Sequence, residues 1–299
     1  LQPEAHQRVQ ATNPMDAPSA AACSWLQACL ARMAQEGASD LFLTAGAPPT
    51  LKRQGAFVPL PFDPLTPQQT REAAYSVMRA SQIAEFEARM ECDLAYQTSP
   101  TERFRVNVHQ QRGQVGMVVR YVSPQIPSID DLHLPSVLKQ LAFLKNGLIL
   151  VVGAAGSGKT TTLASMLDYR NEHTAGHILT VEDPIEYLHA HKKSLVTQRE
   201  VGLDTLSYDE ALRHAMREAP NVIMIGEIRD RTSMQHALHY AEAGHLCVST
   251  LHANNASQAV QRVLNFFPEE AHRQLLMDLS LNLKAVVGQR LVPGAQGGW

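Results

Sequence analysis

The sequence predicts an α/β chain in two parts, a small mixed α+β domain followed by a larger domain built on a parallel sheet. Three observations carry this prediction. Residues 23–122 alternate short strands with helices, a proline-rich stretch follows, and four continuous apolar runs then alternate with helical segments. Continuous apolar strands of this kind indicate a parallel sheet that is covered on both faces.

The length and composition are those of a globular protein. The chain has 299 residues, of which 44% are hydrophobic and 18% are charged, and its formal net charge is −3. This near-neutral balance does not support tight binding to a nucleic-acid backbone. No apolar run approaches the roughly 20 residues that span a bilayer, and the first residues lack a signal-peptide core, so we expect a cytoplasmic protein.

The four cysteines do not have the spacing of a zinc site. They are Cys23, Cys29, Cys92 and Cys247, and no two of them form a Cys-x-x-Cys pair. We therefore expect isolated reduced thiols.

The N-terminal domain is expected over residues 23–122, after a disordered extension over residues 1–22 that is rich in Ala, Pro, Gln and Ser. Apolar residues at helical spacing predict a helix over 25–33. Thr66 followed by Pro67 predicts the start of another helix. The other expected elements are strands at 40–44, 50–53, 92–98, 103–110 and 115–122, and helices at 67–79 and 81–90.

Residues 123–135 contain three prolines and little periodicity, which is typical of an interdomain linker. The second domain is expected over residues 136–299. Its strands are predicted at 148–152, 178–181, 222–225 and 246–248. In parallel sheets, ligands bind beyond the carboxyl ends of the strands.

A phosphate-binding motif stands at such a strand end. Residues 153–160 match G-x-x-x-x-G-K-[ST] at every position, between an apolar strand and an amphipathic helix. Backbone N–H groups of the loop and the helix N-terminus can hold phosphate. We expect Lys159 to reach the β- and γ-phosphates of ATP and Thr160 to offer its hydroxyl to Mg²⁺. The predicted nucleotide-binding residues are Gly153, Ala154, Ala155, Gly156, Ser157, Gly158, Lys159, Thr160 and Thr161.

Carboxylates follow two further strands. The strand 222–225 runs into Gly226 and Glu227, and Gly226 stands where an aspartate usually ligates magnesium. Glu227 is therefore predicted to orient the attacking water. Glu182, after the strand 178–181, is predicted to support the metal through a water. The alternative is that such acids only cap the following helices.

A histidine follows the last strand of the series. His252 could hydrogen-bond the γ-phosphate and report its loss, although a lone histidine is more often a structural residue. His245 opens the same strand. Four other residues are expected on a solvated face: His189, His191, Lys192 and Lys193.

These segments, in this order, resemble the secretion and pilus ATPase family, and within it the type IV pilus retraction ATPases, PilT and PilU. The matching stretches are GAAGSGKTTTLASML, HILTVEDPIEY, LVTQREVGLDTLSYDEALRHAMREAPNVIMIGEIRD and AEAGHLCVSTLHANNA. The resemblance covers about residues 24–293 and includes SDLFLTAGAPPTLK and RFRVNVHQQRG in the N-terminal domain. GHLCVSTLHANNA and DLSLNLKAVVGQRLVP look closer to PilU than to PilT.

The resemblance implies a RecA-like P-loop ATPase domain with an N-terminal PAS-like domain, in a hexameric ring with ATP between the domains. It makes Glu227 the catalytic glutamate of the Walker B box and places Glu182 in the Asp box. It assigns His245 and His252 to the His box as nucleotide contacts. It also implies that N-terminal arginines reach a neighbouring subunit's nucleotide; the matching positions are Arg105, Arg112 and Arg120, each of which could instead be a solvated charge on a strand.

The implied function is an ATP-hydrolysing hexameric motor that drives or assists type IV pilus retraction at the inner membrane. A PilT-like ATPase and an inner-membrane platform protein are the implied partners. One alternative is an accessory module that binds ATP with little turnover; another is a nucleic-acid translocase, which the net charge disfavours. The family's C-terminal helices are expected to be largely absent, and the Cys-x-x-Cys motif of assembly ATPases is not found.

Overall fold

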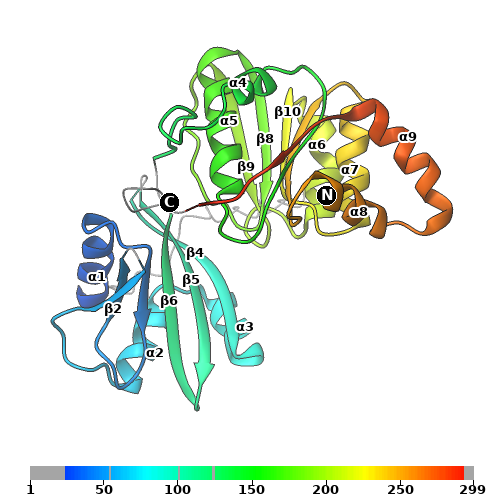
Figure 1. The fold of residues 1–299 in the computed structure, drawn as a ribbon. Coiled ribbons are helices and arrows are strands. Elements are labelled where there is room, and N and C mark those ends of the chain that lie inside the picture. The colour runs from blue at the N-terminus through cyan, green and yellow to red at the C-terminus, as the bar shows by residue number, and fades with distance from the viewer. Residues whose placement is uncertain (1–23, 54, 100–101, 123–124, 293–299) are drawn as a thin grey trace, which may run out of the picture. The chain divides into compact units, whose positions relative to one another are not determined.

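The computed structural model describes residues 24–292 except residues 54, 100–101 and 123–124. The chain divides into two compact units, residues 1–122 and 123–299 (Figure 1), and each is described by itself. The extension predicted over residues 1–22 lies outside the described residues.

The first unit is built on a six-stranded antiparallel sheet with the order β3-β2-β1-β6-β5-β4. Thr66 caps the second helix, since its hydroxyl accepts a hydrogen bond from the Gln69 backbone at 3.2 Å. The short strand β3 was not predicted, because most of its four residues are exposed and show no buried alternation. The elements are α1 (Ser24–Gln35), β1 (Asp40–Leu43), β2 (Thr50–Arg53), β3 (Ala56–Pro59), α2 (Pro67–Ser76), α3 (Ala80–Arg89), β4 (Glu91–Ser99), β5 (Glu102–Gln111) and β6 (Gln114–Val122).

One face of this sheet packs against the three helices and forms the core of the first unit. Phe104, Val106 and Val108 of β5 point to this core, together with Leu30 of α1 and Phe86 of α3. The residues that alternate with them in β5 face the other side of the sheet.

The second unit contains a six-stranded sheet with the order β12-β7-β11-β10-β8-β9, and every described pair in it is parallel. This confirms the α/β prediction. The elements are α4 (Val137–Ala142), β7 (Gly147–Val152), α5 (Lys159–His173), β8 (Gly176–Glu182), β9 (Ser194–Glu200), α6 (Tyr208–Ala215), the 3₁₀ turn η1 (Met216–Glu218), β10 (Val222–Glu227), α7 (Arg231–Glu242), β11 (Leu246–Leu251), α8 (Ala256–Asn265), the 3₁₀ turn η2 (Glu269–Ala271), α9 (His272–Asn282) and β12 (Leu283–Gly288).

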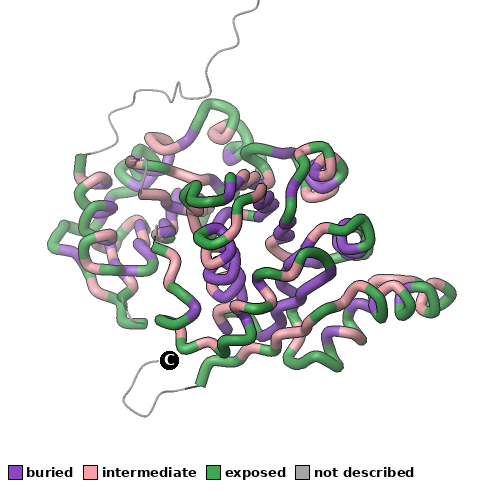
Figure 2. Tube along the Cα trace, turned by 90° about the horizontal axis from the view of Figure 1, so that it is seen from above, coloured by how far each residue is buried: buried purple, intermediate pink, exposed green. Residues whose placement is uncertain are grey.

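Helices cover both faces of the parallel sheet. Alternate residues of β7 point to opposite faces: Leu150 packs in a core with α6 to α9, and Val151 packs in a core with α4 and α5. Figure 2 shows the buried stretches inside and the exposed turns around them. The central strands β7 and β11 are buried at every residue, as their continuous apolar runs predict.

The described part of the stretch predicted as a linker packs on the second unit. Ile129 is 1% exposed and belongs to the core beside α5. The Ser165 hydroxyl of α5 donates to the Pro127 carbonyl at 2.7 Å. Residues 125–135 are thus an ordered start of the second unit.

The described residues contain no helix that could span a membrane and no paired cysteines. None of their helices has the length and apolar character needed to cross a bilayer. Cys29, Cys92 and Cys247 are buried free thiols, and burial raises the pKa of Cys29 to about 11. Cys23 lies outside the described residues.

Candidate nucleotide site

The phosphate loop connects β7 to α5 at the carboxyl end of the parallel sheet. Gly156 and Gly158 have φ angles of +74° and +85°, a region that glycine enters without steric cost. The Lys159 ammonium donates to the carbonyls of Gly153 and Ala154 at 3.1 and 2.8 Å. Burial lowers the pKa of Lys159, and the negative charges of Glu227 and Glu186 oppose this effect.

The loop has the features of a phosphate cradle. The Ser157 hydroxyl is buried and has no hydrogen-bond partner among the described residues. A Cβ atom at Gly153 would collide with this hydroxyl and with the Gln289 carbonyl. The space is therefore available only while position 153 is glycine. A buried, unpartnered hydroxyl beside a buried ammonium suits an anion with several oxygens.

The first turn of α5 is attached to two distant segments. The Thr161 hydroxyl lies 2.9 Å from the Tyr187 hydroxyl, which follows β8. The Thr162 hydroxyl donates to the Gln289 side chain, just after β12, at 2.8 Å. No local sequence pattern predicts either contact, because the partners are 26 and 127 residues apart.

Glu227 lies at the end of β10, and both of its carboxylate oxygens are paired. The His252 Nε2 is 3.1 Å from one oxygen, and the Arg229 Nε donates to the other at 2.8 Å. Arg229 also approaches the Asp183 carboxylate at 3.4 Å. The structure thus brings together the predicted Glu227 and His252. It adds Arg229, which the sequence reasoning missed although it lies only two residues after Glu227.

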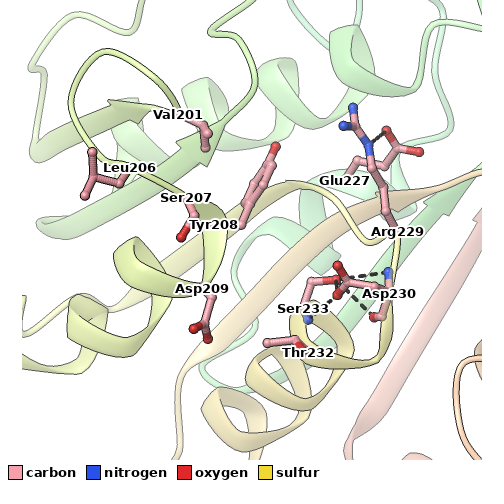
Figure 3. Close-up of a pocket in the computed structure, with 10 residues that line it drawn as sticks. All are labelled: Val201, Leu206, Ser207, Tyr208, Asp209, Glu227, Arg229, Asp230, Thr232 and Ser233. Carbon is pink, nitrogen blue, oxygen red and sulfur yellow. Dashed lines mark hydrogen bonds and ion pairs between the residues drawn. The ribbon is translucent and has the colours of Figure 1, made fainter.

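A cleft of about 410 Å³ opens beside Glu227, between the N-terminal ends of α6 and α7 (Figure 3). The Tyr208 ring lines it, and burial is the main cause that raises the pKa of this tyrosine. A Cβ atom at Gly226 would lie 3.0 Å from the Tyr208 hydroxyl and 3.3 Å from the backbone of β8. A side chain at position 226 would therefore require its neighbours to shift by a few tenths of an ångström.

Glu182 ends β8 and is 4% exposed. Its oxygens accept hydrogen bonds from the Thr180 hydroxyl at 2.7 Å, the Gln198 amide at 3.2 Å and the Glu186 backbone at 3.4 Å. Burial raises the pKa of Glu182 to about 7 against the effect of these bonds. The carboxylate is thus held in place by protein groups, and its contact with a metal through water stays a prediction.

The structure places His245 at the edge of the sheet opposite to the phosphate loop, and its nucleotide contact stays a prediction. His245 precedes β11, and its Nδ1 lies 2.8 Å from the Pro220 carbonyl before β10. The phosphate loop lies at the carboxyl end of the sheet, whereas His245 lies at the amino end. The intervening six-residue strand is roughly 20 Å long.

The predicted arginines all lie in the first unit, on the β5–β6 hairpin. Arg105 is paired across the strands with Arg120, whose Nε donates to the buried Asp40 carboxylate at 2.9 Å. Arg112 occupies the hairpin turn with a φ of +51°. At about 3.3 Å per residue, the backbones of Arg105 and Arg112 are roughly 20 Å apart along the hairpin. Their contact with a nucleotide stays a prediction.

Only part of the face expected to be solvated, residues 189–193, is exposed. His191, Lys192 and Lys193 are exposed, and Lys192 pairs with Asp168 at 2.8 Å. His189 differs, because burial lowers its pKa to about 4 and its backbone donates to Gln198 at 2.8 Å. It is a neutral structural residue next to the partners of Glu182.

Comparisons with known proteins agree on one group of relatives. A family model described as "Type II/IV secretion system protein" matches residues 96–296. The chain is 52% identical over 265 residues to "Type IV pilus ATPase PilU" of Pseudomonas aeruginosa, covering 89% of this chain and 69% of that protein. It is 42% identical over 269 residues to "Type IV pilus retractation ATPase PilT" of the same organism, covering 90% and 78%.

Solved structures show the same fold. The crystal structure of the pilus retraction motor PilT with bound ADP superposes with a TM-score of 0.85 at 44% identity, covering 90% of this chain and 79% of that one. The Legionella pneumophila ATPase DotB gives a TM-score of 0.81 at 24% identity, covering 95% and 80%, and this likeness concerns the fold alone.

Proposed function

Because this chain belongs to the type II/IV secretion system protein family, with a type IV pilus ATPase 52% identical to it, we propose that it is a hexameric motor that drives or assists pilus retraction. The chain is an ATPase of this family. The observation that supports the proposed chemistry best is the grouping of strand ends: the loop after β7 holds Lys159, β10 ends in Glu227, and His252 follows β11.

The phosphate loop is proposed to hold the β- and γ-phosphates of ATP. Lys159 then exchanges its two carbonyl partners for phosphate oxygens. Thr160, the second residue of α5, would hold Mg²⁺ by its hydroxyl, with Glu182 orienting a water of the metal. Bound magnesium neutralises charge on the phosphate oxygens.

Glu227 is proposed to orient the attacking water and to accept its proton. Each of its oxygens has one partner, Arg229 or His252, and keeps a second lone pair that can accept a hydrogen bond from the water. His252 is 42% exposed, so it is free to move towards a γ-phosphate. Loss of that phosphate after hydrolysis would return His252 to Glu227.

The first unit is proposed to be PAS-like and to supply arginines to the nucleotide of a neighbouring subunit. The proposed location is the cytoplasmic side of the inner membrane, at the pilus base. The proposed partners are a PilT-like ATPase and the platform protein of the pilus. The net charge of −3 gives no support to a nucleic-acid partner.

Replacing Glu227 tests the mechanism. Glu227→Ala should lower the ATP turnover of the purified chain by on the order of 100-fold while nucleotide still binds. Glu269→Ala is the matched control, because Glu269 is an exposed acid in η2. It should change neither the ATP turnover nor the nucleotide binding. In cells that lack the native gene, the Glu227 variant should fail to restore twitching motility.

The same turnover assay distinguishes the hexameric motor from the alternative function, an accessory module with little ATP turnover of its own. Unchanged turnover in Glu227→Ala would show that Glu227 is not the base. Negligible turnover in the wild type, rising when a PilT-like ATPase is added, would favour the accessory module.

A further inference from the structure

The phosphate loop has few side chains with which to hold its own shape. Residues 153–158 are Gly-Ala-Ala-Gly-Ser-Gly, and Ala154 and Ala155 are exposed. Two of the glycines have left-handed backbone angles, which cost conformational entropy to fix. The shape of the loop must therefore depend on contacts from outside it.

Gln289 supplies such contacts from the end of β12. Its backbone N–H donates to the Val152 carbonyl at 2.8 Å, which extends the sheet up to the start of the loop. Its side-chain oxygen accepts from the Thr162 hydroxyl at 2.8 Å. Thr162 is 1% exposed and lies in the first turn of α5. One residue thus joins the strand before the loop to the helix after it.

Gln289 also packs against the loop between these two points. A Cβ atom at Gly158 would lie 2.9 Å from the Gln289 side-chain nitrogen, and one at Gly153 would collide with the Gln289 carbonyl. The first and last glycines of the loop are therefore both in close contact with the same residue. The contact is neutral, so it neither repels phosphate nor competes with Lys159.

We propose that Gln289 is a positioning residue that holds the phosphate loop in its nucleotide-binding shape and so connects β12 to the nucleotide site. This rests on the proposed function of the loop. When Lys159 turns to the phosphates, it gives up its bonds to the loop carbonyls. The bonds of Gln289 involve neither Lys159 nor the inside of the loop, so they remain.

Calorimetric titration of the full chain with MgADP tests the proposal. Gln289→Ala should weaken the affinity about five- to tenfold, the size of one lost hydrogen bond together with lost packing. Thr162→Val removes the other partner and should weaken it by a similar factor. The double variant should be no weaker than the weaker single variant, since both remove the same bond. Gln274→Ala, an exposed glutamine in α9, is the control and should bind like the wild type.

Steady-state kinetics distinguishes positioning from general support of the fold. Gln289→Ala should raise KM for ATP with kcat within about twofold of the wild type, at a temperature well below unfolding. A lowered Tm with unchanged affinity for MgADP would show that Gln289 only supports the fold, and would overturn the proposal. Additive losses of affinity in the Gln289→Ala and Thr162→Val double variant would also overturn it. A wild-type chain that binds no MgADP would contradict the proposed function as well.

Discussion

At the residue scale, the carboxylate of Glu227, which we propose to be catalytic, is held by two neighbouring side chains. Glu227 is paired with Arg229 and His252, one partner on each oxygen. A carboxylate held from both sides keeps its position, and each of its oxygens still has a second lone pair that can accept a hydrogen bond from a water. Arg229 also lies 3.4 Å from a second carboxylate, that of Asp183.

Glu182 leads to a prediction about pH. Its pKa is raised from 4.5 to about 7 because the side chain is buried, so the folded chain holds this proton more tightly than the unfolded chain. Stability contributed by the group is therefore present at low pH and decreases as pH rises from about 4.5 to about 7. Glu182→Gln cannot lose this proton. Relative to the wild type, the Tm of the variant should rise by about 5 °C between pH 5 and pH 8.

Thermal unfolding of both chains across this pH range measures the effect. Glu218→Gln, which replaces a partly exposed partner of Arg199, serves as a comparison and should not show the same trend. A Tm difference between Glu182→Gln and the wild type that is constant with pH would contradict the raised pKa.

At the scale of the elements, close packing leaves little room at Gly226, near the end of β10. Gly226→Ala places a Cβ atom 3.0 Å from the Tyr208 hydroxyl and 3.3 Å from two backbone atoms of β8. We expect a loss of stability of about 2 kcal/mol. Tyr208→Phe in the same chain should restore only part of this loss, because the backbone contacts remain. Gly288→Ala is the matched control, since a Cβ atom there meets nothing within 4 Å.

Urea unfolding of these variants provides the measurement. Equal stabilities of Gly226→Ala and Gly288→Ala would show that position 226 has room for a side chain. Close packing would then not be the reason for the glycine at position 226.

How far the sequence predicts each element depends on its burial. β7, β8, β10 and β11 lie inside the sheet and form apolar runs, so they are recognisable without the structure. β9 and β12 are edge strands with many half-exposed or exposed residues, and no continuous run marks them. The place of His245 could be predicted from the sequence, because a residue before a parallel strand lies at the opposite edge of the sheet from the strand's end. The contact of Gln289 with Thr162 was not predictable, since it spans 127 residues.

At the scale of the whole molecule, the fold and family could be predicted because the motif strings extend over most of the chain. The RecA-like and secretion-family prediction is confirmed by the match over residues 96–296 and by the PilT fold. Residue patterns could not predict whether an arginine of one subunit reaches the nucleotide of the next. An arginine on a strand face has the same local sequence whether it binds nucleotide or is only solvated. Only an experiment on mixed assemblies addresses it.

Mixing inactive variants tests the arginines between subunits. Lys159→Ala disables the phosphate loop of its own subunit but leaves its arginines, and Arg105→Ala does the reverse. In an equal mixture of closed rings, about one quarter of the sites should combine an intact loop with an intact arginine from the neighbour, and ATP turnover should recover to about that fraction.

The same mixing test applies to Arg112. Arg105 lies in β5 and Arg112 in the hairpin turn, roughly 20 Å away, so each arginine is replaced separately and each mixture is measured on its own. Arg120 is held by the buried Asp40, so Arg120→Ala should act mainly on the stability of the first unit. If neither mixture recovers activity although both single variants are inactive, the arginines act within their own subunit and the shared site is refuted.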